Sequence, residues 1–283
     1  MSDILICGAA SFVGSSLSGY IMQHTKYYIS TIDELARKEL YDNMYVISGA
    51  KTRNSFYLAK LHDQEISTRI LSLENPKYII WNAADTSNME HAAGDFYVFL
   101  SALAQSNIRP RKILVLLKDY CQSSNLHNEL QSVIGDAKGQ NIVIVNSGML
   151  YGPRQSSDKF IANTIISSLQ NCFQPNNDSR TVEPIYIRDY FFALMKILEE
   201  KSDEGCIYNL FGGVSVEKRM LSHDINYFIT TGNWPDSLWT GGKSERPDGI
   251  DVEVITKNSY LETIEHTIAW YANNKWFWDK GAE

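Results

Sequence analysis

Cysteine and histidine are scarce in this sequence, and neither follows a metal-binding pattern. The four cysteines (Cys7, Cys121, Cys172 and Cys206) have no paired spacing, which excludes a disulfide framework and a zinc site of the usual spacing. The six histidines form neither a His-x-His nor a His-Glu-x-x-His pattern, the patterns that bring imidazoles together on one element. The sequence therefore predicts no metal site and reduced cysteines, with Cys7 buried in a strand.

The sequence also lacks a basic excess and a long apolar run. Its formal net charge is −7, so it offers no cationic face to nucleic acid or to an anionic membrane. No stretch reaches the roughly 18 apolar residues of a membrane-spanning helix. An apolar segment follows Met1-Ser2-Asp3 at once, without a basic leader. We therefore expect a soluble, cytoplasmic protein, with 44% hydrophobic residues supporting a folded chain.

Short β-branched segments alternate with longer amphipathic segments in the first half of the chain. This alternation is typical of a parallel sheet with helices on both faces. The sequence therefore predicts a doubly wound α/β fold. The predicted strands are residues 4–7, 28–32, 78–81, 112–117 and 141–146, and the predicted helices are residues 15–24, 64–73, 96–105 and 160–169.

The pattern changes near Tyr151, where we place a domain boundary. Residues 1–150 form the predicted nucleotide-binding domain, and residues 151–283 form mainly a smaller substrate lobe. Within this second part, residues 182–211 are expected to return to the sheet of the first domain. A helix in this segment is predicted to begin with Asp189 as its N-cap, because a carboxylate accepts hydrogen bonds from the first free N–H groups of a helix.

A glycine loop directly follows the first predicted strand and leads into the first predicted helix. Such a loop turns backbone N–H groups and a helix N-terminus toward one point, where a pyrophosphate is stabilised. Its position near the start of a strand–helix–strand unit makes the pattern more specific than a pair of glycines alone. The loop reads Gly8-Ala9-Ala10-Ser11-Phe12-Val13-Gly14.

An acidic residue ends the second predicted strand. Asp33 follows Gly14 by nineteen residues, where a carboxylate accepts hydrogen bonds from a ribose and repels a 2′-phosphate. This arrangement predicts NAD as the cofactor. NADP is the alternative, because two cations, Arg37 and Lys38, follow soon after Asp33.

Three segments occur in one order along nearly the whole chain: the glycine loop, Ile79-Ile80-Trp81-Asn82-Ala83-Ala84, and Leu150-Tyr151-Gly152-Pro153-Arg154-Gln155. In this order the chain resembles the extended short-chain dehydrogenase/reductases that modify nucleotide sugars, and especially the dTDP-glucose 4,6-dehydratases. The resemblance implies a Rossmann domain and a substrate lobe for a nucleotide sugar. The cofactor-binding residues that it implies are Gly8, Ser11, Phe12, Val13, Gly14, Asp33, Ala83 and Ala84.

The resemblance also implies substrate contacts and a dimer. Asn146 precedes Tyr151 by five residues, as in the dehydratases, and Arg246 matches an arginine that the family retains in its last loop. Together with Arg154, which follows the Tyr-Gly-Pro motif, these are the expected substrate-binding residues. Family members commonly dimerise through the helix that carries the catalytic tyrosine, here residues 126–137, so a homodimer is expected.

The resemblance fails at the catalytic pair. The family uses a Tyr-x-x-x-Lys pair, whose lysine lowers the pKa of the tyrosine. Here the family interval points to Tyr120, but the fourth residue after it is Ser124. A phenol without a nearby cation keeps a pKa of about 10, so only about one in a thousand is ionised at neutral pH. Tyr120 is therefore a weak catalytic candidate, and Lys118 or Lys138 is the cation that could replace the lysine.

The acid–base loop of the dehydratases is missing as well. In that group a Thr-Asp-Glu sequence stands before the catalytic tyrosine, whereas here the strand predicted at 112–117 runs directly into Lys118-Asp119-Tyr120. Cys121 offers a thiol nucleophile in the same place, although a single cysteine is more often a packed side chain. The sequence thus lacks the residues that carry out standard 4,6-dehydration.

Several positions that bind the cofactor or the substrate in the family also carry different residues here. Ser11 stands at the middle glycine of the loop, where a Cβ would crowd the pyrophosphate if the backbone needed a positive φ. Lys60 stands where the family usually has an aspartate near the adenine. Two arginines that grip the nucleotide diphosphate in the family correspond here to Val182 and Phe192. These differences predict weaker binding of both ligands.

Three functional hypotheses follow. The first is a divergent NAD(P)-binding relative of the nucleotide-sugar epimerases and dehydratases that is unable to perform standard dehydration. The second is an active reductase, epimerase or dehydratase with a non-standard acid–base set around Tyr120. The third is a non-catalytic scaffold that binds a protein partner.

Overall fold

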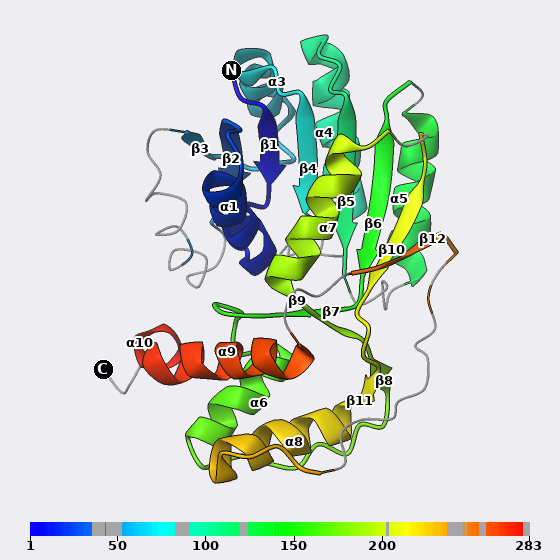
Figure 1. Cartoon of the computed structure of the whole chain (residues 1–283). Helices are drawn as coiled ribbons and strands as arrows, with labels where there is room; N and C mark the ends of the chain where they lie inside the picture. The colour runs from blue at the N-terminus through cyan, green and yellow to red at the C-terminus, as the bar shows by residue number, and fades with distance from the viewer. Residues whose placement is uncertain are drawn as a thin grey trace. The chain divides into compact units, whose positions relative to one another are not determined.

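The computed structural model describes residues 1–35, 43, 53–82, 91–118, 124–137, 139–201, 204–236, 246, 248–254 and 259–279. The chain divides into two compact units (Figure 1). Unit 1 comprises Met1–Ser147, Leu194–Asn209 and Asp248–Ile250, and unit 2 comprises the remaining segments, which begin at Gly148, Leu210 and Asp251. No helix in the described ranges has both the length and the apolar character that a membrane crossing requires.

An eight-stranded sheet in the order β12-β10-β6-β5-β4-β1-β2-β3 organises the first part of the structure. The six strands from β6 to β3 in this order pair in parallel, which confirms the predicted doubly wound α/β fold. The strands are β1 (Ile4–Cys7), β2 (Ile29–Asp33), β3 (Asn54–Leu58), β4 (Tyr78–Asn82), β5 (Lys112–Leu117), β6 (Ile142–Ser147), β10 (Ile207–Phe211) and β12 (Ile250–Glu253).

Helices cover both faces of this sheet. Figure 1 shows α1 on one face, and α3, α4 and α5 on the other. Strands β1, β5 and β6 are buried at every position, because a parallel sheet with two covered faces has no solvent-facing side. The helices of this unit are α1 (Phe12–His24), α3 (Gln64–Glu74), α4 (Ala92–Ser106) and α5 (Ser124–Asp136), and α7 (Ile187–Glu199) ends in it.

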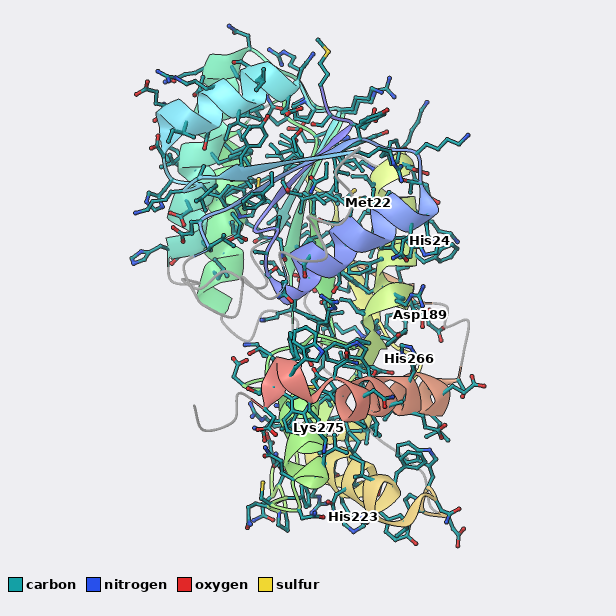
Figure 2. All side chains as sticks on the ribbon, turned by 90° about the vertical axis from the view of Figure 1, so that its left-hand side faces the viewer. Met22, His24, Asp189, His223, His266 and Lys275 are labelled. Carbon is teal, nitrogen blue, oxygen red and sulfur yellow. The ribbon has the colours of Figure 1, made fainter. Side chains whose placement is uncertain are left out.

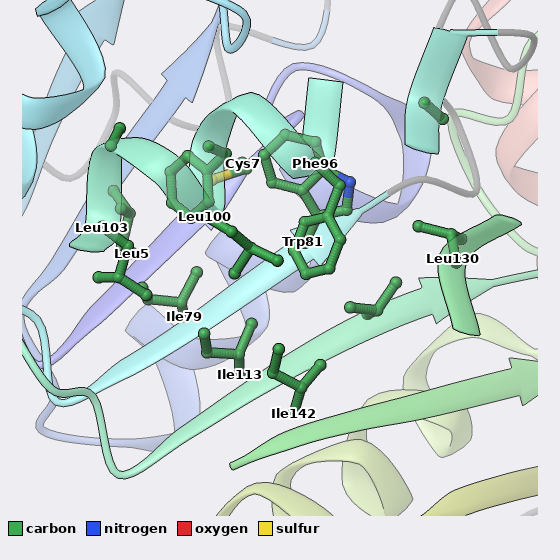
Figure 3. Packing of buried hydrophobic residues seen from close by; sticks show 14 of the residues in the cluster. Leu5, Cys7, Ile79, Trp81, Phe96, Leu100, Leu103, Ile113, Leu130 and Ile142 are labelled. Carbon is green, nitrogen blue, oxygen red and sulfur yellow. The ribbon is translucent and has the colours of Figure 1, made fainter. Parts of the chain in front are cut away.

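The core under α4 is built around an indole. Trp81 on β4 is 1% exposed, and its ring lies 5.2 Å from Phe96 and 5.0 Å from Phe99, measured between ring centroids. Figure 3 shows Trp81 beside Phe96, together with the surrounding aliphatic side chains of β1, β4 and β5. Tilted aromatic contacts of this kind fix the distance between a helix and a sheet. This core therefore fixes the end of β4, where Asn82 lies.

The described part of unit 2 contains short strands, the helices α6, α8 and α9, and the short helix α10. Its strands are β7 (Met149–Tyr151), β8 (Thr181–Val182), β9 (Pro184–Tyr186) and β11 (Val216–Glu217), and its helices are α6 (Phe160–Leu169), α8 (Lys218–Thr231), α9 (Tyr260–Asn273) and α10 (Lys275–Trp278). Strand β7 pairs with β9 in parallel, and β8 pairs with β11 antiparallel.

Three helices begin earlier than the sequence predicted: α1 at Phe12, α4 at Ala92 and α7 at Ile187. Helix α7 begins at Ile187, so Asp189 lies in its first turn instead of at its N-cap. The strand β9 ends at Tyr186, and the chain turns into the helix without an intervening residue. A carboxylate in the first turn still stabilises the helix through its interaction with the helix dipole.

Candidate functional site

The glycine loop between β1 and α1 is packed so tightly that two of its residues must be glycine. Gly8 has a φ of +74°, and a Cβ there would lie 3.2 Å from the backbone oxygen of Asn82. A Cβ on Gly14 would lie only 2.2 Å from the carbonyl oxygen of Gly8. The first turn of α1, which contains Phe12 and Val13, therefore rests directly on the loop.

Ser11 serves as the N-cap of α1. Its φ is −65°, and its Oγ accepts a hydrogen bond from the N–H of Gly14 at 3.1 Å. The same Oγ donates to the carbonyl oxygen of Gly8 at 2.9 Å and accepts from Nδ2 of Asn82 at 2.7 Å. The strain that the sequence analysis linked to a positive φ does not arise, because the backbone of Ser11 is extended. The serine holds the loop together.

Replacing Ser11 with the glycine of the family pattern is therefore expected to destabilise the protein. The Ser11→Gly variant loses the side-chain cap and leaves the buried Nδ2 of Asn82 with only its longer hydrogen bond to the carbonyl oxygen of Gly8, at 3.3 Å. Together these losses lower the free energy of unfolding by about 1 kcal/mol. Ser259→Gly is the matched control, since Ser259 caps the exposed start of α9 without a buried partner. Urea unfolding of both variants measures the difference. Tighter NAD binding by Ser11→Gly at unchanged stability would show instead that the serine obstructs the loop.

Asp33 anchors the loop from the end of the neighbouring strand. Its Oδ2 accepts from the N–H of Ala10 at 2.8 Å, and its Oδ1 accepts from the N–H of Leu35 at 2.9 Å. The residue is only 6% exposed. Burial, reinforced by the charge of Asp33, raises the pKa of the Cys7 thiol well above its ordinary value. Cys7 is therefore a packed side chain and has no role as a nucleophile.

The residues around the loop suit a polar cofactor. Asp33 contributes a carboxylate, which accepts hydrogen bonds from hydroxyl groups. Asn82 and Asn43 each use their Nδ2 for a bond to the loop, to Ser11 Oγ and to the carbonyl oxygen of Ala10. Their Oδ1 atoms are buried and have no hydrogen-bond partner within the described part of the chain. Buried acceptors of this kind call for a donor, such as a hydroxyl group of a bound ligand.

Several predicted site residues lie outside the described residues. These are Ala83, Ala84, Arg37, Lys38 and Tyr120, together with Asp119, Cys121 and Lys138. The described chain stops at Lys118, one residue beyond β5, and resumes at Ser124, where α5 begins. The catalytic role of Tyr120 thus stays a prediction. Lys60 is described and is exposed, and it follows the strand that pairs Leu58 with Asp33.

Asn146, one of the predicted substrate-binding residues, lies inside the sheet. Its side chain is fully buried, and its Nδ2 donates to Oδ1 of Asn209 on β10 at 2.9 Å. This bond joins two neighbouring strands of the sheet. The contact gives Asn146 a structural role, and its direct contact with a substrate stays a prediction.

Arg154 and Arg246, the other two predicted contacts, belong to unit 2. Arg154 is half-buried and has a φ of +71°, an unusual conformation that fixes the direction of the turn after Gly152. Arg246 forms a two-point contact with Glu183, from Nη2 to Oε1 at 2.6 Å and from Nε to Oε2 at 3.1 Å. Its Nη1 donates to Asp251 at 2.9 Å. Arg246 therefore already has anionic partners within the chain.

A tyrosine–histidine pair in unit 2 was not predicted from the sequence. The hydroxyl of Tyr186 and Nδ1 of His266 are 3.0 Å apart, and burial raises the pKa of Tyr186 while the nearby Arg188 lowers it. Figure 2 shows His266 on α9 and His223 on α8, so these histidines belong to different helices. Within the described ranges, no group of three or more His, Cys, Asp or Glu side chains is placed to hold a metal ion.

The chain resembles known proteins in its structure, whereas comparison of its sequence finds no match. Neither a protein-family model nor a curated protein matches the sequence. The dTDP-glucose 4,6-dehydratase of Bacillus anthracis, solved with NAD, matches with a TM-score of 0.77 at 16% identity, over 98% of each chain. The chain has the fold of the nucleotide-sugar dehydratases and epimerases.

Two solved epimerases resemble this chain to a similar extent. The UDP-glucose 4-epimerase of Thermotoga maritima, solved with UDP-glucose, has a TM-score of 0.73 at 16% identity and matches over 96% of this chain and 99% of its own. The UDP-glucuronic acid 4-epimerase of Bacillus cereus, solved with UDP-glucuronic acid and NAD, has a TM-score of 0.73 at 15% identity, over 95% and 99%. The fold implied by the sequence resemblance is thus confirmed.

The helix that the resemblance assigns to a dimer interface is α5. Among its described side chains, the exposed ones are polar or small, and burial is confined to positions such as Leu126 and Leu130 that face the core. A stable subunit interface usually has an apolar centre. The homodimer stays a prediction, and this surface gives it no apolar patch. The exposed residues of α5 are Asn128, Glu129, Gln131, Ser132, Gly135 and Asp136.

Proposed function

We propose that unit 1 binds NAD at the glycine loop, and that the chain is a divergent relative of the nucleotide-sugar dehydratases and epimerases without standard 4,6-dehydratase activity. The observation that carries the first part is the packing of Gly14 against Gly8, which leaves no room for a Cβ. A loop that approaches a helix so closely presents its N–H groups to a pyrophosphate. The NAD in the solved dehydratase and epimerase structures of the same fold supports this assignment.

Each part of the site has a task in cofactor binding. The N–H groups of Phe12 and Val13 would receive the pyrophosphate at the positive end of α1. The Asp33 carboxylate, fixed by the N–H of Ala10, would accept ribose hydroxyl groups, and the buried Oδ1 of Asn82 would accept a further donor. When bound, NAD supplies a hydride acceptor for the oxidation of a sugar hydroxyl.

The second part of the proposal rests on the residues after β5. Ser124 replaces the lysine that would activate Tyr120, and the Thr-Asp-Glu loop has no counterpart. We expect the purified protein to form no 4-keto-6-deoxy product from dTDP-glucose with NAD. Formation of that product would support the alternative of an active enzyme with a non-standard acid–base set. NAD binding without turnover of any nucleotide sugar would support the divergent relative. Failure to bind NAD would support the third hypothesis, a non-catalytic scaffold.

The Asp33→Asn variant tests the cofactor assignment. The amide oxygen of an asparagine can accept only one of the two backbone hydrogen bonds, and its NH₂ group would face the other N–H donor. We therefore expect the NAD dissociation constant to rise about tenfold to hundredfold, and the preference for NAD over NADP to fall because the repulsive carboxylate is gone. Isothermal titration calorimetry with both cofactors measures the two effects.

The neighbouring Glu34 provides the control, because it is exposed and its change to Gln removes the same charge. Glu34→Gln is expected to leave the NAD affinity within about twofold, as an exposed charge contributes little. A wild-type protein that prefers NADP, or an Asp33→Asn variant with unchanged NAD affinity, would contradict the role of Asp33.

A further inference from the structure

Strand β2 accepts the first three N–H groups of the glycine loop. Those of Gly8 and Ala9 donate to the carbonyl oxygen of Ile32, at 3.0 and 3.2 Å. That of Ala10 donates to the carboxylate of Asp33 at 2.8 Å. These donors are therefore directed to the sheet. The next donors along the chain are the first N–H groups of α1, which have no acceptor within the helix.

Asn43, in the segment between β2 and β3, binds the other polar group of Ala10. Its Nδ2 donates to the carbonyl oxygen of Ala10 at 2.9 Å. The N–H and the C=O of Ala10 are thus both hydrogen-bonded to side chains, those of Asp33 and Asn43. Ala10 is fully buried, and Asn43 is 5% exposed, so water competes little for these bonds. Two side chains therefore fix the orientation of the Ala10 backbone.

The bond from Asn43 also sets the direction of the next N–H group. The peptide between Ala10 and Ser11 is trans, and in a trans peptide the N–H points opposite to the C=O. Because the carbonyl group of Ala10 points to Asn43, the N–H of Ser11 points away from it. Ser11 is the N-cap of α1, so this N–H belongs to the donors at the helix N-terminus, where an anion is stabilised.

Stability alone does not account for the buried amide of Asn43. Its Oδ1 is buried and has no hydrogen-bond partner among the residues that the structure describes. A buried acceptor without a partner costs at least as much free energy as one hydrogen bond contributes. The bond to Ala10 and the unpaired Oδ1 therefore oppose each other in the free energy of unfolding. The distinct contribution of Asn43 is the geometry of the loop.

We propose that Asn43 is a positioning residue for the cofactor, which holds the carbonyl group of Ala10 and thereby directs the N–H of Ser11 toward the pyrophosphate of NAD. This inference rests on the proposed function, because it takes the glycine loop as the NAD site. It adds that a side chain from outside the loop determines how well the loop receives a pyrophosphate. Asn43 acts through the loop backbone and not by contact with the cofactor.

The test compares NAD binding by wild type, Asn43→Ala and Asn43→Leu in isothermal titration calorimetry on the full-length protein. Both variants release the carbonyl group of Ala10, and the leucine also keeps the volume of the asparagine. In both, the NAD dissociation constant is expected to rise about tenfold. Adenosine, titrated by NMR, is the probe that lacks the pyrophosphate. Its dissociation constant is expected to stay within about twofold of wild type, because the Ser11 donor acts on the pyrophosphate.

Asn141 is the matched control within unit 1. Its Nδ2 also donates to a backbone carbonyl, that of Arg111 at 3.1 Å, and its Oδ1 is also buried without a partner in the described chain. It directly precedes β6, so it lies at the opposite end of the parallel strands from the loop that follows β1. Asn141→Ala is expected to leave the NAD affinity within about twofold. Thermal unfolding without NAD should shift by similar amounts in Asn43→Ala and Asn141→Ala, since each loses one such bond.

A cofactor-free measurement tests the peptide direction directly. The amide nitrogen resonance of Ser11 reports the hydrogen bond to the preceding carbonyl group. It is expected to shift in Asn43→Ala and to stay in place in Asn141→Ala. An unchanged Ser11 resonance in a folded Asn43→Ala variant would contradict the proposed orientation of the peptide by Asn43.

Three binding results would also overturn the inference. The first is NAD affinity within about twofold of wild type in the folded Asn43 variants. The second is an equal loss of adenosine affinity, since Asn43 would then act on another part of the ligand. The third is an equal loss of NAD affinity in Asn141→Ala, which would trace the effect to stability. A wild-type protein that binds no NAD contradicts the proposed function, whereas wild-type binding with unaffected Asn43 variants contradicts the role of Asn43 alone.

Discussion

The Gly14→Ala variant is expected to lose NAD binding and to unfold more easily than the wild type. The added Cβ would lie 2.2 Å from the carbonyl oxygen of Gly8 and 2.7 Å from Cα of Ala9. Both contacts are with backbone, which cannot rotate away, so the loop and the start of α1 must separate. We expect the free energy of unfolding to fall by about 2–3 kcal/mol, and the NAD dissociation constant to rise by about a hundredfold or more.

Gly94 supplies a closely matched control for this variant. Gly14 and Gly94 are each the third residue of their helix, in α1 and α4, but a Cβ on Gly94 meets nothing within 4 Å. Gly94→Ala is therefore expected to raise the free energy of unfolding by about 0.5–1 kcal/mol, as alanine restricts the unfolded chain. Thermal unfolding with and without NAD compares the two. Equal behaviour of both variants would mean that the glycine loop has no tight packing to lose.

The strands buried on both faces were predictable from the sequence. The predicted boundaries 4–7 and 112–117 coincide with β1 and β5, because such strands are continuous apolar runs. Strand β3, Asn54–Leu58, was missed. It lies at the edge of the sheet, is half-exposed, and mixes polar with apolar residues, so its pairing with β2 decides its structure and its composition does not.

The position of the cofactor loop was also predictable, but the roles of its side chains were not. A loop sequence does not reveal its φ angles, so Ser11 was interpreted as a source of strain where the structure makes it the helix cap. Its partner Asn82 is 71 residues away, and Glu183 is 63 residues from Arg246. Contacts over such separations depend on how the elements pack, which residue spacing does not encode. The one available signal was Asn82 itself, a polar residue that ends an apolar strand.

Unit 2 is expected to unfold steeply at alkaline pH, because at least four of its described tyrosines have a raised pKa. Burial raises the pKa of Tyr151, Tyr186, Tyr260 and Tyr271 above the ordinary value. Below a pH of about 10 their phenols are neutral in both the folded and the unfolded chain, so stability does not depend on them. Above that pH only the unfolded chain releases the protons, and the folded state loses stability until its own raised pKa values are reached.

The expected loss is about 1.4 kcal/mol per tyrosine for each pH unit, as long as the pH stays below the raised pKa of that tyrosine. It reaches on the order of 5 kcal/mol per unit where all four are still neutral in the folded protein. Since a typical domain is stable by roughly 5–15 kcal/mol, unfolding is expected within about two pH units above 10. Absorbance at the phenolate band should first rise as exposed tyrosines such as Tyr97 ionise, and its later rise should coincide with the change in circular dichroism. The Tyr271→Phe variant, which removes one buried phenol, should make the pH dependence shallower by about a quarter. Tyr97→Phe, at a residue 57% exposed on α4, is the control and should leave it unchanged. The difference in phenolate absorbance between wild type and Tyr271→Phe reports Tyr271 alone. If that difference rose well before the ellipticity changed, Tyr271 would ionise in the folded protein, and burial would be removed as the cause.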